Sequence, residues 1–351
     1  MHNGQHFDYQ IEIVRPSDGR RFGRRQVPDS HLEPVREQLL FAAQRRGKAP
    51  ADLTGIEACD VPQFEDDQSG EIASLTFNLG QGTDRVEQRH GLDLFQPVAS
   101  AISAELVQSK QLEANEEIIC RTYARPAASH LSTNGVKASV KRQPLPLLSG
   151  QIDDFLALAK AVGTLHHDDY PVFVLDEVLE RAHDLSWKGR SLEGGSWLIG
   201  GLYQQTTPKP EIFAVIHSVL EARGATHERF RIEMSTETFL DLQAQMQRRK
   251  RFAQTPETEI GAYHTHPFLP SILDGKEACP TCPLQKECNL TSSFFSQTDA
   301  QFHKALFGRA PYTVEMVLGL TPREEFDLRM FVMDGSGFRQ RGYYRLTSLP
   351  T

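Results

Sequence analysis

The sequence contains no apolar run that approaches the roughly 20 residues needed to span a membrane. Its first ten residues, MHNGQHFDYQ, lack the basic and apolar regions of a signal peptide. An excess of basic charge is also missing: 38 Lys and Arg stand against 46 Asp and Glu, and the resulting formal charge of -8 would repel a nucleic-acid backbone. We therefore expect a cytoplasmic protein whose partners include neither a membrane nor a nucleic acid.

Cysteine is scarce and odd in number, with five in 351 residues. A disulfide framework normally has an even number spread through a small secreted chain. Three of the five, Cys279, Cys282 and Cys288, lie together in CPTCPLQKEC. Short-spaced thiols of this kind bind zinc or an iron–sulfur cluster. We predict a second, structural metal at this cluster, with free thiols in a surface loop as the alternative.

The fourth ligand of this cysteine cluster stays open. The candidates are a non-protein group, His303, Cys120 and Cys59. Cys59 and Cys120 have no recognisable nucleophile setting, so we expect both to be buried structural cysteines.

The length exceeds what one hydrophobic core usually organises, so we expect two domains. A stretch rich in Pro, Ser and Gly over 126–150 indicates the boundary. We predict a mixed α+β domain of unknown role over 1–150, a linker over 151–170 and an α/β domain over 171–351. Hydrophobic periodicity predicts strands over 9–14, 74–79 and 117–123, and helices over 31–45, 94–112, 176–183 and 236–250.

The most informative stretch is EIGAYHTHP, in which His264 and His266 are two residues apart. In a strand both imidazoles face the same side of the sheet. Two imidazoles on one face are suitable ligands for zinc, which favours nitrogen donors and tetrahedral geometry. An H-x-H pair alone is weak evidence, because two separately hydrogen-bonded histidines would have the same spacing.

Two further motifs can complete such a site. In FFSQTDAQFHKALF, Ser296 and Asp299 are three residues apart and share a helix face, so Asp299 can supply a third ligand. The same S-x-x-D spacing is also a helix capping box. Upstream, Glu193 precedes two glycines and a short apolar strand, where its carboxylate could accept a proton from a metal-activated water. Glu257 and Glu259 are the alternative bases nearest in sequence.

In the order E-x-G-x-x-x-x-G, H-x-H-P and S-x-x-D, these motifs resemble the JAMM signature of the JAB/MPN metallopeptidases, a family of deubiquitinating and related isopeptidases. The resemblance covers about residues 171–345. It implies a curved mixed sheet flanked by helices, related in shape to the nucleoside-deaminase fold.

The resemblance also assigns roles to single residues. His264, His266 and Asp299 match the zinc ligands, Glu193 matches the general base, and Ser296 matches the residue that hydrogen-bonds the oxyanion. In the family the serine follows the H-x-H-P proline closely, whereas here 29 residues separate Pro267 from Ser296. An insertion over about 268–293 is therefore expected on the rim of the site.

The resemblance implies a zinc-dependent hydrolase that cleaves the amide bond after the carboxyl-terminal tail of a ubiquitin-like protein, from a conjugate or a precursor. Cognate activating and conjugating enzymes of a prokaryotic system would be its partners. Such a tail would bind as an added strand.

Two other functions stay open. The first is a JAB/MPN scaffold that binds a partner without catalysis. The second is a zinc deaminase, which would use the C-x-x-C of Cys279 and Cys282 but requires an H-x-E where this chain has His264-Thr265-His266.

Overall fold

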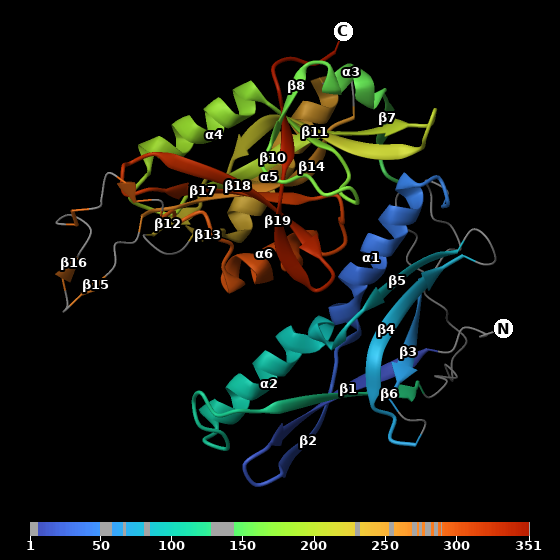
Figure 1. Cartoon of the computed structure of the whole chain (residues 1–351). Helices are drawn as coiled ribbons and strands as arrows, with labels where there is room; N and C mark the ends of the chain where they lie inside the picture. Colours follow the sequence, from blue (N-terminus) through green and yellow to red (C-terminus); the bar gives the residue numbers. More distant parts are fainter. Residues whose placement is uncertain are drawn as a thin grey trace. The chain divides into compact units, whose positions relative to one another are not determined.

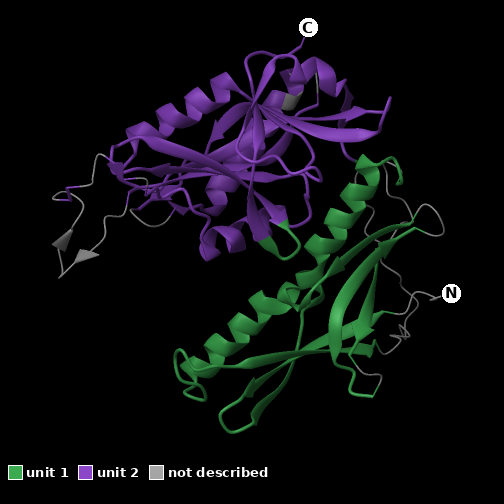
Figure 2. Cartoon of the chain, in the orientation of Figure 1, with its two compact units in different colours: residues 1–144, 334–337 green, residues 145–333, 338–351 purple. Residues whose placement is uncertain are grey.

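The computed structural model describes residues 6–49, 58–65, 68–80, 85–127, 144–228, 232–252, 256–268 and 290–350, together with the pairs 272–273, 276–277, 282–283 and 287–288. The chain forms two compact units (Figure 2). Unit 1 comprises residues 1–144 and 334–337, and unit 2 comprises 145–333 and 338–351. No helix in the described part of the chain is long and apolar enough to cross a membrane.

In its described residues, unit 1 combines two three-stranded sheets, ordered β2-β1-β6 and β3-β4-β5, with two α-helices and one short helix of a single turn. Its elements are β1 (Phe7–Arg15), β2 (Arg20–Gln26), α1 (Asp29–Arg45), β3 (Cys59–Phe64), β4 (Ile72–Leu79), β5 (Val86–His90), the short helix η2 (Leu92–Phe95), α2 (Gln96–Gln108) and β6 (Ile119–Pro126). The expected helix over 94–112 is shorter in the structure: its first two residues belong to η2, and α2 runs from Gln96, with Pro97 in its first turn, to Gln108.

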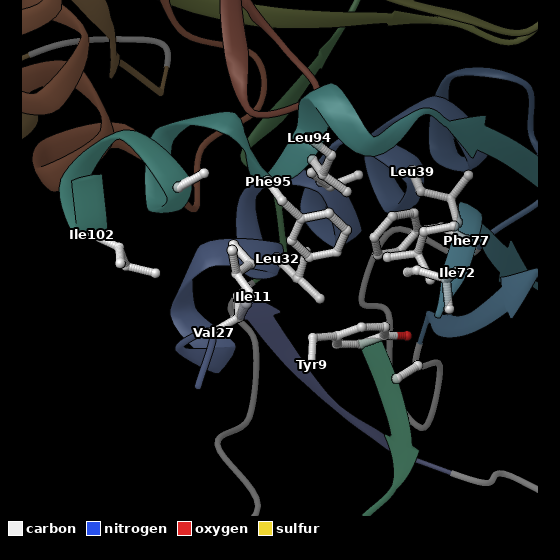
Figure 3. Packing of buried hydrophobic residues seen from close by; sticks show 14 of the residues in the cluster. Tyr9, Ile11, Val27, Leu32, Leu39, Ile72, Phe77, Leu94, Phe95 and Ile102 are labelled. Carbon is white, nitrogen blue, oxygen red and sulfur yellow. The ribbon is translucent and has the colours of Figure 1, made fainter. Parts of the chain in front are cut away.

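The hydrophobic core of unit 1 consists of apolar side chains of α1 and α2 packed against apolar side chains of the strands. Figure 3 shows Tyr9, Phe77 and Phe95 among these buried side chains. The rings of Tyr9 and Phe95 have centroids 5.7 Å apart, and the buried Tyr9 hydroxyl donates to Asp60 at 2.6 Å. Unit 1 thus has a hydrophobic core of its own.

Unit 2 is a mixed α/β unit whose strands form a curled sheet of ten strands (Figure 1). The strand order is β19-β18-β17-β14-β10-β11-β9-β20-β8, with β7 pairing to β10. Its strands are β7 (Leu147–Ser149), β8 (Ala159–Val162), β9 (Val172–Leu175), β10 (Gly195–Gln205), β11 (Glu211–Glu221), β14 (Thr258–His266), β17 (Val314–Leu320), β18 (Phe326–Asp334), β19 (Gly337–Arg341) and β20 (Tyr343–Leu346). The helices are α3 (Ile152–Leu156), α4 (Asp176–Lys188), α5 (Thr236–Phe252) and α6 (Gln297–Phe307), and two small ribbons are β12 (Thr226–His227) with β13 (Ile232–Glu233) and β15 (Ile272–Leu273) with β16 (Lys276–Glu277).

The expected linker over 151–170 lies inside unit 2. Within it, β8 pairs antiparallel with β20, while the Phe155 ring of α3 packs 5.0 Å from that of Phe213. Leu147 and Leu148, just before it, pair with β10. The stretch rich in Pro, Ser and Gly over 126–150 contains the boundary between the units at residue 144, whereas the predicted domain limit at 150 and the linker over 151–170 lie too late.

Helices cover both faces of the sheet around β10 and β14. Helix α4 packs against β9 and β11. Side chains of α5 and α6, including Leu242, Met246 and Phe307, form a buried cluster with Trp197 and Ala262 of the sheet. Ala262 has the same strand parity as His264 and His266, so these two histidines lie on the α5 and α6 side.

Candidate metal centre

The two histidines of the H-x-H motif lie at the end of β14, between the antiparallel neighbour β10 and the parallel neighbour β17. His264 and His266 are 8% and 5% exposed, and their ring centroids are 4.8 Å apart. Strand alternation directs both to one face, as the sequence predicts.

Asp299 enters from the first turn of α6. Its Oδ2 atom lies 3.5 Å from Nε2 of His264 and 3.6 Å from Nε2 of His266. One ligand atom from each of the three residues lies within 4.8 Å of the others. Zinc binds nitrogen and carboxylate oxygen at about 2.0–2.2 Å, so tetrahedral ligands lie about 3.4 Å apart. The three side chains are therefore spaced as ligands of one ion.

The donor atoms themselves also fit a metal. Nε2 of His264 is buried and has no hydrogen-bond partner among the described residues. A buried polar atom without a partner is costly, and a metal ion would remove that cost. On the other side of each ring, Nδ1 already has an acceptor: Oε1 of Glu315 lies 3.0 Å from His264, and the carbonyl of Ser292 lies 2.8 Å from His266. These acceptors favour the Nδ1–H tautomer and leave Nε2 for the metal.

A glycine on β17 makes the contact to His266 possible. Gly319 pairs with His266 in the register, and a Cβ atom on Gly319 would lie 1.9 Å from the backbone nitrogen of Ser293. The absence of a side chain therefore lets the backbone of Ser292 and Ser293 cross the strand closely. This approach brings the Ser292 carbonyl to the imidazole.

The electrostatics of the cluster follow from its burial. Burial alone would lower the pKa of His264, but the neighbouring carboxylates of Asp299 and Glu315 outweigh it and raise that pKa well above its usual range. For Asp299 burial acts to raise the pKa, and the partners His264 and Ser296 reverse this and lower it. The pKa of His266 is lowered by burial and by the charge on His264. Glu315 is held below its usual pKa, against the effect of burial, by His264 and His303.

Glu193 stands directly before β10, at the strand end beside the histidines. Its backbone is held on both sides, because its amide donates to Glu228 at 2.7 Å and Nδ1 of His227 donates to its carbonyl at 2.9 Å. The next residue, Gly194, exchanges two hydrogen bonds with Thr265. Burial raises the pKa of the Glu193 carboxyl to about 7, and the charges of His264 and Asp299 also act on it. The Glu193 carboxyl group thus interacts electrostatically with two candidate metal ligands, and its pKa lies near pH 7.

Glu193 also lines a cavity of about 200 Å³ at the carboxyl end of α4. Apolar atoms of Leu185, Leu192 and Tyr263 form part of its wall. Tyr263 and Thr265, which alternate with the two histidines, face this cavity and not the candidate metal site.

Ser296 is the N-cap of α6. Its hydroxyl accepts a hydrogen bond from the Asp299 amide, and the Asp299 carboxylate accepts one from the Ser296 amide. Both interpretations of the S-x-x-D spacing are therefore compatible, because the capping carboxylate is the same group that faces His264 and His266. Capping uses a lone pair of the Ser296 oxygen and leaves its hydrogen for donation.

The cysteines differ from expectation. Cys59 and Cys120 are exposed free thiols, so the prediction that both are buried was wrong. Cys59 lies on β3 and Cys120 on β6, which are edge strands of the two sheets of unit 1, and neither side chain is packed in the core. Cys282 and Cys288 are partly exposed, and Cys279 lies outside the described residues.

His303 is unsuited as the fourth ligand of the cysteine cluster. It is 1% exposed, and its two ring nitrogens already contact Glu315 and Thr313. Glu315, Gly319 and the Ser292 carbonyl were not identified from the sequence. Glu315 stands within the apolar strand VEMVLGL, and a charged residue inside such a run is the signal that could have pointed to it.

Comparison with known proteins adds little. No family model and no curated protein matches the chain. Among solved structures, protein DSY2949 from Desulfitobacterium hafniense, whose solution structure is known, aligns over 51% of this chain and 94% of its own, with 12% identity and a TM-score of 0.33. A similarity of this level carries no argument about fold or function.

Proposed function

We propose that unit 2 is a JAB/MPN domain of the JAMM type, and that the chain is a zinc-dependent isopeptidase. The observation that carries the proposal is the convergence of Glu193, His264, His266 and Asp299, which come from three separate sequence motifs, at one end of the sheet. A curled mixed sheet between helices also agrees with the fold that the resemblance implies.

His264, His266 and Asp299 would hold the zinc ion. Zinc in such a site lowers the pKa of a water molecule from about 15.7 towards about 7 and polarises a substrate carbonyl. Glu193 would take one proton from the attacking water as the oxygen of that water bonds to the carbonyl carbon and the carbonyl π electrons move to its oxygen. When the C–N bond of the resulting tetrahedral species breaks, Glu193 would pass the proton to the leaving amine nitrogen. Ser296 donates its hydroxyl hydrogen to the carbonyl oxygen as negative charge develops there.

Glu193 is better placed for this role than Glu257. The carboxylate of Glu257 receives two hydrogen bonds from Arg249, at 2.7 and 2.8 Å, which lower its pKa and occupy both of its oxygens. A deaminase is disfavoured, because such an enzyme requires an H-x-E where this chain has His264-Thr265-His266, and because the two histidines assemble with Asp299 among the described residues.

The substrate class rests on the sequence resemblance. The scissile bond would follow the carboxyl-terminal tail of a ubiquitin-like protein, joined to a lysine or to a fusion partner, and cognate activating and conjugating enzymes would supply the conjugates.

Metal analysis and turnover of two variants test the proposal. Asp299→Ala should lose one zinc per chain, because it removes a ligand. It should stay folded, because Asp299 is partly exposed and the loss on the protein side is that of one helix cap. Glu193→Gln should keep that zinc and lose nearly all hydrolysis of a ubiquitin-like protein fused to a fluorescent reporter. Full zinc occupancy in Asp299→Ala would refute the metal site, and substantial turnover by Glu193→Gln would refute the assignment of the base.

A further inference from the structure

A buried polar network stands behind the candidate metal ligands. Glu315 of β17 is 3% exposed and bridges two histidines: Oε1 lies 3.0 Å from Nδ1 of His264, and Oε2 lies 2.9 Å from Nδ1 of His303. His303 in turn lies 3.2 Å, through Nε2, from the hydroxyl oxygen of Thr313. All four side chains are buried.

The hydrogen-bond pattern fixes where the protons are. The Thr313 hydroxyl donates its single hydrogen to the carbonyl of Ala310 at 2.7 Å, so its oxygen must accept from Nε2 of His303. His303 then carries a proton on Nε2 and shares a second one with the Glu315 carboxylate. This makes the Glu315–His303 pair a buried, hydrogen-bonded ion pair whose remaining acceptor oxygen faces His264.

The network also joins the two elements that supply the ligands. Asp299 and His303 are four residues apart on α6, so they share one face of that helix. Glu315 lies on β17, whose neighbour β14 carries His264. The path from His264 through Glu315 to His303 therefore holds α6 against the sheet and sets the separation between His264 and Asp299.

From these contacts we infer that Glu315 is a positioning residue for the metal site: it holds His264 in the Nδ1–H tautomer with Nε2 directed at the metal, and His303 and Thr313 hold Glu315. The inference rests on the proposed metal site and assigns to it three residues outside the E, H-x-H and S-x-x-D motifs.

Zinc affinity of Glu315→Gln, measured by competition with a chromophoric chelator, tests the assignment. This substitution preserves volume and removes the charge, and loss of such a supporting carboxylate typically weakens metal binding about 10- to 100-fold. Glu257→Gln is the matched control, because Glu257 is also a buried glutamate with charged or titratable partners. Its carboxylate forms an ion pair with Arg249 and lies 3.7 Å from His217, and no ion pair or hydrogen bond joins it to a candidate metal ligand among the described residues. We expect less than a threefold change in that control.

Nitrogen-15 NMR of the imidazoles provides a second measurement that needs no substitution. In the zinc-loaded wild-type protein, His264 should show a protonated Nδ1 and a metal-bound Nε2, and His303 should show protons on both nitrogens. Thr313→Val, which removes the acceptor of His303, should shift the His303 and His264 signals together, while Thr313→Ser should restore them.

The outcomes separate the inference from the proposed function. If wild-type protein binds no zinc at His264, the metal site itself is wrong. If wild-type protein binds zinc and Asp299→Ala does not, but folded Glu315→Gln binds it as tightly as wild-type, the positioning role is refuted. Metal bound to Nδ1 of His264 in the wild-type spectra would refute it even if Glu315→Gln fails to fold.

Discussion

Ser296 and Asp299 hydrogen-bond each other in both directions: the Ser296 amide donates to Oδ2 of Asp299 at 2.7 Å, and the Asp299 amide donates to the Ser296 hydroxyl at 3.1 Å. The oxygen that completes the helix cap is the same Oδ2 that lies 3.5 Å from Nε2 of His264. The start of α6 and the candidate metal ligand are therefore one structural unit.

Ser296→Ala should have two separable effects. Loss of the cap costs about 1 kcal/mol of stability, and loss of the hydroxyl donor should lower kcat about 100-fold. Zinc should remain bound, because Asp299 still accepts from the backbone amide of residue 296. Thermal unfolding, zinc content and kcat measure the three quantities. Ser296→Thr is the control, since threonine also caps helices and keeps a hydroxyl donor. A kcat of folded Ser296→Ala equal to that of the wild-type protein would show that the hydroxyl has no role in turnover.

Gly319→Ala should weaken zinc binding although it replaces none of the candidate ligands. The added Cβ has to displace the backbone near Ser293 and with it the Ser292 carbonyl that contacts His266. We expect zinc affinity to fall about 10-fold, as for other losses of ligand support, with a lower unfolding temperature. Gly189→Ala is the control, because a Cβ there meets no atom within 4 Å. Unchanged zinc affinity in folded Gly319→Ala would contradict this account.

Zinc binding should be tighter at higher pH. In the metal-free protein the pKa of His264 is raised, so this residue is protonated near pH 7 and zinc must displace a proton. Because the pKa of His264 is raised to about 10, this residue stays mostly protonated between pH 6 and 8, and each pH unit increases its deprotonated fraction about 10-fold. The apparent zinc affinity should therefore rise up to about 10-fold per pH unit over this range. Calorimetry in two buffers of different ionisation enthalpy measures the released protons. Affinity that is constant across this range would show that His264 is already neutral in the metal-free protein.

The predicted metal at the cysteine cluster is tested by Cys282→Ser. If the cluster binds a structural metal, this variant should lose one metal equivalent beyond the zinc at His264, and residues 268–293 should become more sensitive to protease. Colour in the wild-type protein would indicate iron–sulfur rather than zinc. Cys59→Ser, at an exposed thiol of unit 1, is the control. Unchanged metal content and protease resistance would favour free thiols.

A folded substrate should be cleaved far faster than its tail. A metal-activated water does not discriminate between amides, so binding of the remote folded body must bring the tail carbonyl to the site. Comparison of kcat/KM for an intact ubiquitin-like fusion and for a free peptide of its last ten or so residues measures this contribution. Equal values would identify a general metallopeptidase without a docking requirement.

The sequence predicted the local elements and the grouping of the candidate ligands better than the connections between the elements. His264, His266 and Asp299 were identified because ligand chemistry restricts residue type and spacing, and the structure brings them together. The exposure of Cys59 and the place of β8 in the sheet depend on contacts between distant segments, which periodicity does not report. Glu315 was missed for the same reason, since its partners lie 12 and 51 residues away in sequence.

The hydrogen bond between Gly194 and Thr265 spans 71 residues, and that between Glu315 and His264 spans 51. Glu193, the histidines and their support therefore come together only after β10, β14, α6 and β17 have all been synthesised and paired. A nascent or partly unfolded chain would contain these residues without the assembled site. On the proposed function, the topology of the sheet would thus delay proteolytic activity until the domain has folded.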